Sequence, residues 1–198
     1  MQGNGEGARP KGSLLYEMAR SVMLFWYKMM GWKIVGTLPP QTKFVIIAAP
    51  HTSNWDLPFM LAVGMSARIK VYWMGKDSIF KPPFGGLMRK LGGVSIDRSA
   101  KNNVVEQMAA EFDKRDEFIL AVAPEGTRSG VKRWKTGFYH IAHQAQVPIV
   151  LGFLDYEKKT GGIAQILVPS GDCDLDLIEI KKFYRTVKGK YPDQGEVK

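Results

Sequence analysis

Short apolar runs alternate along this chain with stretches of helical periodicity, and this alternation restricts the fold more than any other feature of the sequence. Most of the runs lack the apolar–polar alternation of a half-exposed strand, which is typical of strands buried on both faces of a sheet. The pattern therefore predicts an α/β fold with a largely parallel central sheet flanked by helices. The expected strands are residues 44–49, 70–74, 93–96, 118–123 and 149–154, and the expected helices are residues 57–66, 84–91, 101–115 and 137–146.

The last part of the chain departs from this alternation. Residues 152–157 and 163–168 flank a Lys-Lys-Thr-Gly-Gly turn, which predicts a hairpin and so an antiparallel edge in the sheet. A final helix is expected at residues 175–188, after the capping residues Asp172 and Asp174.

The 198 residues suit one domain, because they can bury a sizeable core and contain no low-complexity linker. We expect an α/β domain at residues 34–190, preceded by a mobile head at residues 1–12 and followed by a mobile tail at residues 191–198. Residues 13–33 form an amphipathic helical segment in this division, with Ser13 as its N-cap.

The helical segment is rich in apolar residues but too short between charges to cross a bilayer, since its longest charge-free run covers residues 21–27. Two interpretations remain on pattern alone: a helix packed on the core, or a helix at a membrane surface beside Lys28 and Lys33. The apolar positions are Leu14, Leu15, Met18, Val22, Phe25, Trp26, Met29 and Met30.

The charge balance points to a phosphate-bearing partner, because 28 Lys and Arg against 19 Asp and Glu give a net charge of +9. Of this excess, +8 lies in the first hundred residues, together with the most aromatic stretch of the chain. That coincidence favours an anionic membrane surface over nucleic acid, which we do not expect as a partner. The single Cys173 excludes an internal disulfide and fits a reducing compartment, so we expect a peripheral membrane protein on the cytoplasmic face.

The first candidate for catalysis follows the first strand, in Pro50-His51-Thr52-Ser53-Asn54-Trp55-Asp56. Imidazole titrates near neutral pH, and a carboxylate on its second nitrogen fixes the tautomer and stabilises the imidazolium. His51 is therefore a candidate general base with Asp56 as its orienting partner. The alternative is that Asp56 only caps the next helix while His51 bonds locally.

Two further polar clusters follow other strands. Glu125, Gly126, Thr127 and Arg128 come after residues 118–123, and Arg98 comes after residues 93–96. An arginine there suits a phosphate, although local ion pairs or a helix cap would give the same pattern. In an α/β sheet such strand ends are where ligands bind, so the clusters are expected to converge.

These three blocks, the second of them residues 93–98, are followed by Val147-Pro148-Ile149. In this order the four resemble the blocks of the glycerolipid acyltransferases, typified by 1-acyl-glycerol-3-phosphate acyltransferases, from about residue 33 to residue 152. The resemblance implies transfer of a fatty acyl group from acyl-CoA or acyl carrier protein to a lysophospholipid hydroxyl, as a step of phospholipid biosynthesis. It implies His51 and Asp56 as the catalytic pair. Implied substrate-binding residues are Arg98, Glu125, Gly126, Thr127, Arg128, Lys76 and Lys135.

The resemblance implies no metal and no cofactor besides the acyl donor, since a thioester is already activated. It also favours membrane contact for residues 13–33. Pro50 stands where the family often has Asn, and Leu151 replaces a second proline, which leaves another acceptor open, such as an amino-acid lysolipid. A non-catalytic protein that binds anionic membranes is the alternative from another functional class.

Overall fold

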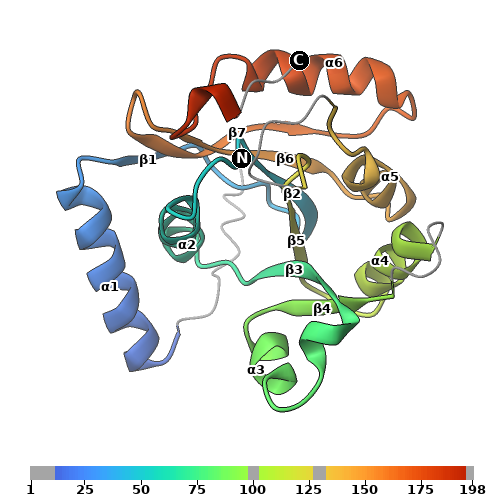
Figure 1. The fold of residues 1–198 in the computed structure, drawn as a ribbon, viewed down its shortest axis with the longest axis horizontal. Helices are drawn as coiled ribbons and strands as arrows, with labels where there is room; N and C mark the ends of the chain where they lie inside the picture. Colours follow the sequence, from blue (N-terminus) through green and yellow to red (C-terminus); the bar gives the residue numbers. More distant parts are fainter. Residues whose placement is uncertain (1–11, 98–102, 127–132, 195–198) are drawn as a thin grey trace, which may run out of the picture.

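The computed structural model describes residues 12–97, 103–126 and 133–194, and it has an α/β architecture built on one seven-stranded sheet (Figure 1). The strand order is β1-β7-β6-β2-β5-β3-β4, and all neighbours run parallel except β6 and β7. The expected parallel sheet with an antiparallel hairpin is thus confirmed. The strands are β1 Lys33–Val35, β2 Lys43–Ala49, β3 Val71–Lys76, β4 Gly93–Ile96, β5 Phe118–Val122, β6 Ile149–Asp155 and β7 Thr160–Leu167.

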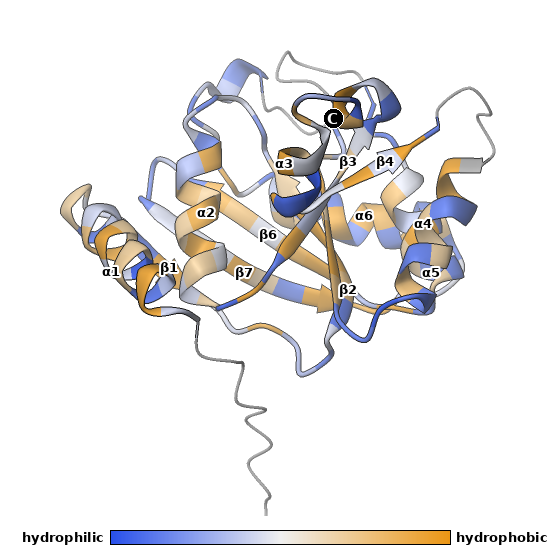
Figure 2. Cartoon of the chain, turned by 90° about the horizontal axis from the view of Figure 1, so that it is seen from below, coloured by the Kyte–Doolittle hydropathy of each residue, from blue (hydrophilic) through white to orange (hydrophobic). Residues whose placement is uncertain are grey.

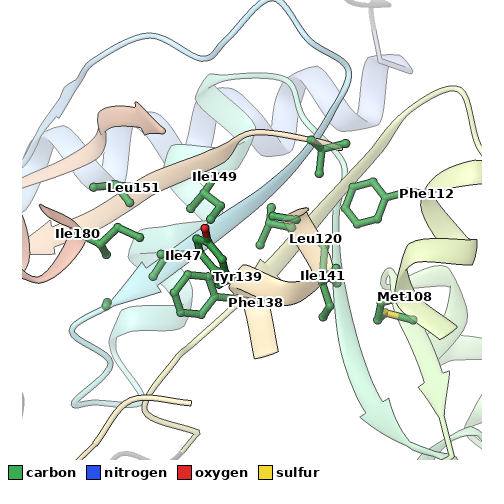
Figure 3. Close-up of a cluster of buried hydrophobic side chains, with 14 of the residues drawn as sticks. Ile47, Met108, Phe112, Leu120, Phe138, Tyr139, Ile141, Ile149, Leu151 and Ile180 are labelled. Atoms are coloured by element: carbon green, nitrogen blue, oxygen red, sulfur yellow. The ribbon is translucent and has the colours of Figure 1, made fainter. Parts of the chain in front are cut away.

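Helices cover both faces of the sheet (Figure 1). Side chains alternate along β2, so that Val45 and Ile47 join one buried cluster while Phe44 and Ile46 join another. The first cluster packs against α4, α5 and α6, and its Phe112, Leu120, Phe138 and Ile180 appear in Figure 3. The helices are α1 Leu14–Met29, α2 Asp56–Ser66, α3 Gly85–Lys90, α4 Asn103–Asp113, α5 Gly137–Gln144 and α6 Cys173–Tyr184, with short 3₁₀ turns at Asp77–Phe80 and Pro192–Gln194.

Helix α1 begins at Ser13, whose side chain accepts the N–H of Tyr16, and it is shorter than the expected segment 13–33. Gly31 has a φ of +79° and donates to the carbonyl of Lys28, while the N–H of Trp32 reaches the carbonyl of Tyr27. These two bonds form the glycine-dependent motif that ends helices. The chain therefore leaves the helix before Lys33, which already pairs with β7.

Polar contacts from one side of α1 fasten it to the end of α2. Nε of Arg20 donates to the carbonyl of Met65 at 2.9 Å, and Glu17 forms a bidentate ion pair with Arg68. Tyr27 is the buried side chain of α1, whereas most of its apolar residues are exposed. Figure 2 shows α1 at the edge of the molecule, with hydrophobic (orange) stretches along it. None of the helices in the described part of the chain is long and apolar enough to cross a membrane. The exposed apolar residues of α1 are Leu14, Leu15, Met18, Val22, Phe25 and Met29, each at least 58% exposed.

The final helix ends four residues earlier than expected, at Tyr184 rather than residue 188. Tyr184 is buried and donates its hydroxyl to the carbonyl of Gly152 at 2.9 Å, which holds this turn of the helix against the sheet. Beyond it the chain turns back, with Val187 buried, and runs to the carboxyl ends of β2 and β6. The sequence pattern of acid followed by base over residues 174–190 does not reveal this return.

Candidate active site

His51 lies in the loop that joins β2 to α2, Asp56 is the first residue of α2, and the two side chains contact each other directly. Nδ1 of His51 is 3.0 Å from Oδ2 of Asp56. Asp56 is only 2% exposed, whereas the His51 side chain is 29% exposed. The same Oδ2 accepts the backbone N–H groups of Thr52 and Ser53, each at 2.9 Å. Asp56 therefore fixes the loop and the imidazole at once. It does not cap α2, because the N-cap is Trp55 and no side chain makes a capping hydrogen bond there.

The hydrogen bonds to Asp56 determine where the hydrogen between Asp56 and His51 lies. Burial raises the pKa of Asp56, but hydrogen bonds from His51, from the N–H of Ser53 and from the hydroxyl of Tyr156 outweigh it and leave the pKa below its usual value. An ionised carboxylate only accepts hydrogen bonds. Nδ1 of His51 must then carry the hydrogen that faces Asp56, which leaves the lone pair of the neutral ring on Nε2.

Glu125 joins the pair because β5 lies parallel to β2, so that their carboxyl ends meet at one edge of the sheet. Oε1 of Glu125 accepts the backbone N–H of His51 at 3.2 Å, and the residue is only 5% exposed. Oε2 has no hydrogen-bond partner among the described residues. Burial, reinforced by the charge of Asp56, raises the pKa of Glu125 against its hydrogen bonds from backbone N–H groups.

Gly126 and Lys135 lie beside Glu125. Gly126 has a φ of +67°, and a Cβ at this position would lie 2.8 Å from Nζ of Lys135. The backbone conformation favours glycine here, and a Cβ would also displace the flexible end of the Lys135 side chain. The backbone N–H of Lys135 donates to the carbonyl of Pro124, and this bond holds Lys135 beside the end of β5.

The remaining predicted residues are placed as follows. Lys76 is exposed at the end of β3, and β5 separates it from β2 in the sheet. Arg98, Thr127 and Arg128 lie outside the described residues. The structure therefore brings His51, Asp56, Glu125, Gly126 and Lys135 together in two adjacent groups, and it sets Lys76 one strand further along the same edge.

Three contacts around the pair were not predicted from the sequence. The hydroxyl of Tyr156 donates to Oδ1 of Asp56 at 2.8 Å, and the N–H of Tyr191 donates to Oγ1 of Thr52 at 3.3 Å. Nζ of Lys190 lies 4.9 Å from the ring centroid of Trp55. The only signal for Tyr156 is that β6, which precedes it, is parallel to β2 and therefore ends at the same edge. Strand order is needed to use that signal.

The chain is similar to known acyltransferases in sequence and in fold. The family model described as Acyltransferase matches residues 33–150. The chain is 28% identical over 134 residues to a 1-acyl-sn-glycerol-3-phosphate acyltransferase of Haemophilus influenzae, with 63% of this chain and 54% of the relative covered. It is 32% identical over 126 residues to the enzyme of the same name from Saccharomyces cerevisiae, with 60% and 41% covered.

A solved structure shares the fold. The crystal structure of the 1-acyl-sn-glycerophosphate (LPA) acyltransferase PlsC from Thermotoga maritima superimposes with a TM-score of 0.59 at 18% identity, covering 87% of this chain and 79% of that one. Because the family model matches more than half of the residues, the chain belongs to the acyltransferase family. It spans about half the length of the curated relatives that it matches.

Proposed function

We propose that this protein transfers a fatty acyl group from an acyl thioester, acyl-CoA or acyl carrier protein, to the hydroxyl of a lysophospholipid such as 1-acyl-glycerol-3-phosphate. The observation that carries the proposal is the His51–Asp56 contact of 3.0 Å at the carboxyl end of a parallel sheet. The names of the relatives from Haemophilus influenzae and Saccharomyces cerevisiae support the reaction and the acceptor.

In the proposed reaction, Nε2 of His51 takes the proton of the acceptor hydroxyl as its oxygen attacks the thioester carbonyl carbon. The C–O bond forms, the carbonyl becomes an oxyanion, and Asp56 stabilises the imidazolium through Nδ1–H. When the tetrahedral intermediate collapses, the C–S bond breaks and the proton passes from Nε2 to the departing thiolate. The products are the acylated lipid and the free thiol of the donor.

The acceptor's phosphate is proposed to meet the basic residues at the same edge. Nζ of Lys135 lies over Gly126, beside the buried Glu125, whose Oε2 has no partner among the described residues. An ammonium group and an acceptor oxygen at this edge of the sheet suit a ligand that carries both a phosphate and a polar hydrogen. Lys76, Arg98 and Arg128 are the further candidates for this charge, and Thr127 is next to Arg128 in the sequence.

Helix α1 is proposed to contact the anionic cytoplasmic face of a membrane. Its exposed apolar residues form a face that the described part of the chain leaves uncovered, and Lys28 lies in the last turn of the same helix. Arg20 and Glu17, on its other side, hold the helix against α2. Membrane contact would place the site where a lysophospholipid resides.

The experiment that tests the function measures thiol release from acyl-CoA and from acyl carrier protein, with vesicles that contain lysophosphatidate or another lysolipid. We expect release that depends on the lysolipid, and we expect His51→Ala to lower it at least about a hundredfold. His140→Ala is the matched control, since His140 is exposed on α5. A protein that binds the vesicles but releases no thiol with any donor would be a membrane binder, and the proposal would be wrong.

A further inference from the structure

Both oxygens of Asp56 are held by hydrogen bonds, and they come from two separate parts of the chain. Oδ2 faces the imidazole and the N–H groups of Thr52 and Ser53, all within the β2–α2 loop. Oδ1 accepts from the hydroxyl of Tyr156, which is 100 residues away in sequence, at 2.8 Å. With donors on both sides the carboxylate has one rotation about its Cβ–Cγ bond that satisfies all of them.

Tyr156 is itself held on three sides, so its hydroxyl has a fixed position. Its backbone N–H donates to the carbonyl of Lys188 at 2.8 Å. Its ring packs edge-on against Trp32, with centroids 4.9 Å apart, and against Phe59, with centroids 5.8 Å apart. Such packing restricts the ring to one orientation.

The turn that carries Tyr156 is also ordered. Oδ1 of Asp155, a buried residue at the end of β6, accepts the N–H groups of Glu157 and Lys158 at 3.1 and 3.0 Å. The register of the sheet pairs Phe153 with Ala49, so that Tyr156 and the His51 loop leave the sheet at neighbouring points.

We infer that Tyr156 is a positioning residue for the reaction: its hydroxyl holds Oδ1 of Asp56 and thereby keeps Oδ2 aimed at His51. This inference rests on the proposed function and adds a third residue to the catalytic pair. Tyr156 acts through Asp56, because its hydroxyl donates to Oδ1 while His51 lies on Oδ2. Burial, together with the hydrogen bond to Asp56 and the charge of that carboxylate, raises the pKa of Tyr156 above the ordinary value, which agrees with a donor role.

Tyr156→Phe tests the inference because it removes the hydroxyl and leaves the packed ring. We expect kcat to fall about 10- to 100-fold, the range for one hydrogen bond to a charged group, with KM for the lysolipid unchanged. Tyr27→Phe is the matched control, because its hydroxyl, in the same aromatic cluster, has no hydrogen-bond partner among the described residues. We expect that variant to keep the wild-type kcat.

Two further measurements separate positioning from a purely structural role. In an Asp56→Asn background, Tyr156→Phe should slow the reaction far less than in the wild-type background, because the two residues act in series. In carbon-13 NMR spectra, the pKa of Asp56 should rise in Tyr156→Phe and stay unchanged in Tyr27→Phe, a readout that does not need activity. If the wild-type chain transfers no acyl group, the proposed function fails while the NMR comparison still decides the role of Tyr156. An unchanged pKa of Asp56, or equal slowing in both backgrounds, would overturn the inference.

Discussion

Oε1 of Glu125 accepts the backbone N–H of His51 at 3.2 Å, so Glu125, from one predicted motif, holds the backbone of His51, from another. The contact follows from the pairing of Ile47 with Val122, because two parallel neighbours continue in register beyond the sheet. Glu125 therefore has two tasks: it supports the loop of His51, and it presents a second oxygen at the proposed acceptor site.

Replacing Glu125 with Gln should raise the free energy of unfolding and lower the activity. Burial raises the pKa of Glu125, so ionising it in the folded state has a cost that is absent below the unfolded pKa and complete above the folded pKa. Since Gln does not ionise, the free energy of unfolding of Glu125→Gln should exceed that of the wild type increasingly as the pH rises from about 4. Urea unfolding at several pH values measures this, and thiol release should fall about tenfold or more. A constant stability difference at all pH values would show that the carboxyl does not carry this cost.

Replacing Asp56 with Asn should lower turnover about a thousandfold or more, because the amide no longer fixes the imidazole tautomer. Its lowered pKa gives Asp56 a stabilising effect that exists above the unfolded pKa and is lost as the pH falls through the folded pKa. The stability of the wild type over Asp56→Asn should accordingly be largest at neutral pH and vanish in strong acid. Kinetics at neutral pH and urea unfolding from acid to neutral pH check the two parts, and a variant with wild-type turnover would exclude Asp56 from the reaction.

Tyr27→Phe should raise the free energy of unfolding by about 1 kcal/mol. The hydroxyl of Tyr27 is buried, and it has no hydrogen-bond partner among the described residues, so folding removes it from water without replacement. Denaturant unfolding provides the measurement, with Tyr184→Phe for comparison. The hydroxyl of Tyr184 donates to the carbonyl of Gly152, so Tyr184→Phe should lower the free energy of unfolding by a similar amount. Equal effects of the two substitutions would contradict this difference.

Phe25→Glu should weaken binding to anionic vesicles roughly 10-fold or more, because it replaces an apolar side chain on the exposed face of α1 with a negative charge. Val168→Glu is the control, since Val168 is 76% exposed at the far end of β7, away from α1. Sedimentation with vesicles of anionic and neutral lipids gives the partition of each variant. If both variants bind equally well, α1 is not the contact surface.

The parts of the fold predicted correctly are those that depend on neighbours in sequence. Strand β4 at Gly93–Ile96 and the existence of the β6–β7 hairpin follow from local apolar runs and a turn. The turn itself was predicted at residues 158–162, whereas Thr160, Gly161 and Gly162 already pair with β6 as part of β7. Strand β1 was missed because Lys33–Val35 has three residues, too few for any periodicity. The end of α6 depends on the packing of Tyr184 against the sheet, which no local pattern contains.

The candidate site also has one part that depends on neighbours in sequence and another that depends on distant parts of the chain. Five positions separate His51 from Asp56, and one loop brings them together. Spacing alone left this contact open beside a helix cap with local bonding, and the resemblance to the acyltransferases favoured the contact. Tyr156 and Tyr191 reach that loop from 100 and 139 residues away from their partners. Their contribution depends on the strand order and on the direction of the chain after α6, and neither can be read from a single sequence.

The return of the chain after α6 also sets the order in which the site is completed during synthesis. The loop of His51 leaves the ribosome early, but the strands on both sides of β2, namely β5 and β6, come later, and Tyr191 comes near the end. A growing chain thus exposes the catalytic loop without the contacts that shape it. The proposed acyl transfer should therefore begin only after Tyr191 has been made, and a truncation that removes Tyr191 should affect the site before it affects the sheet.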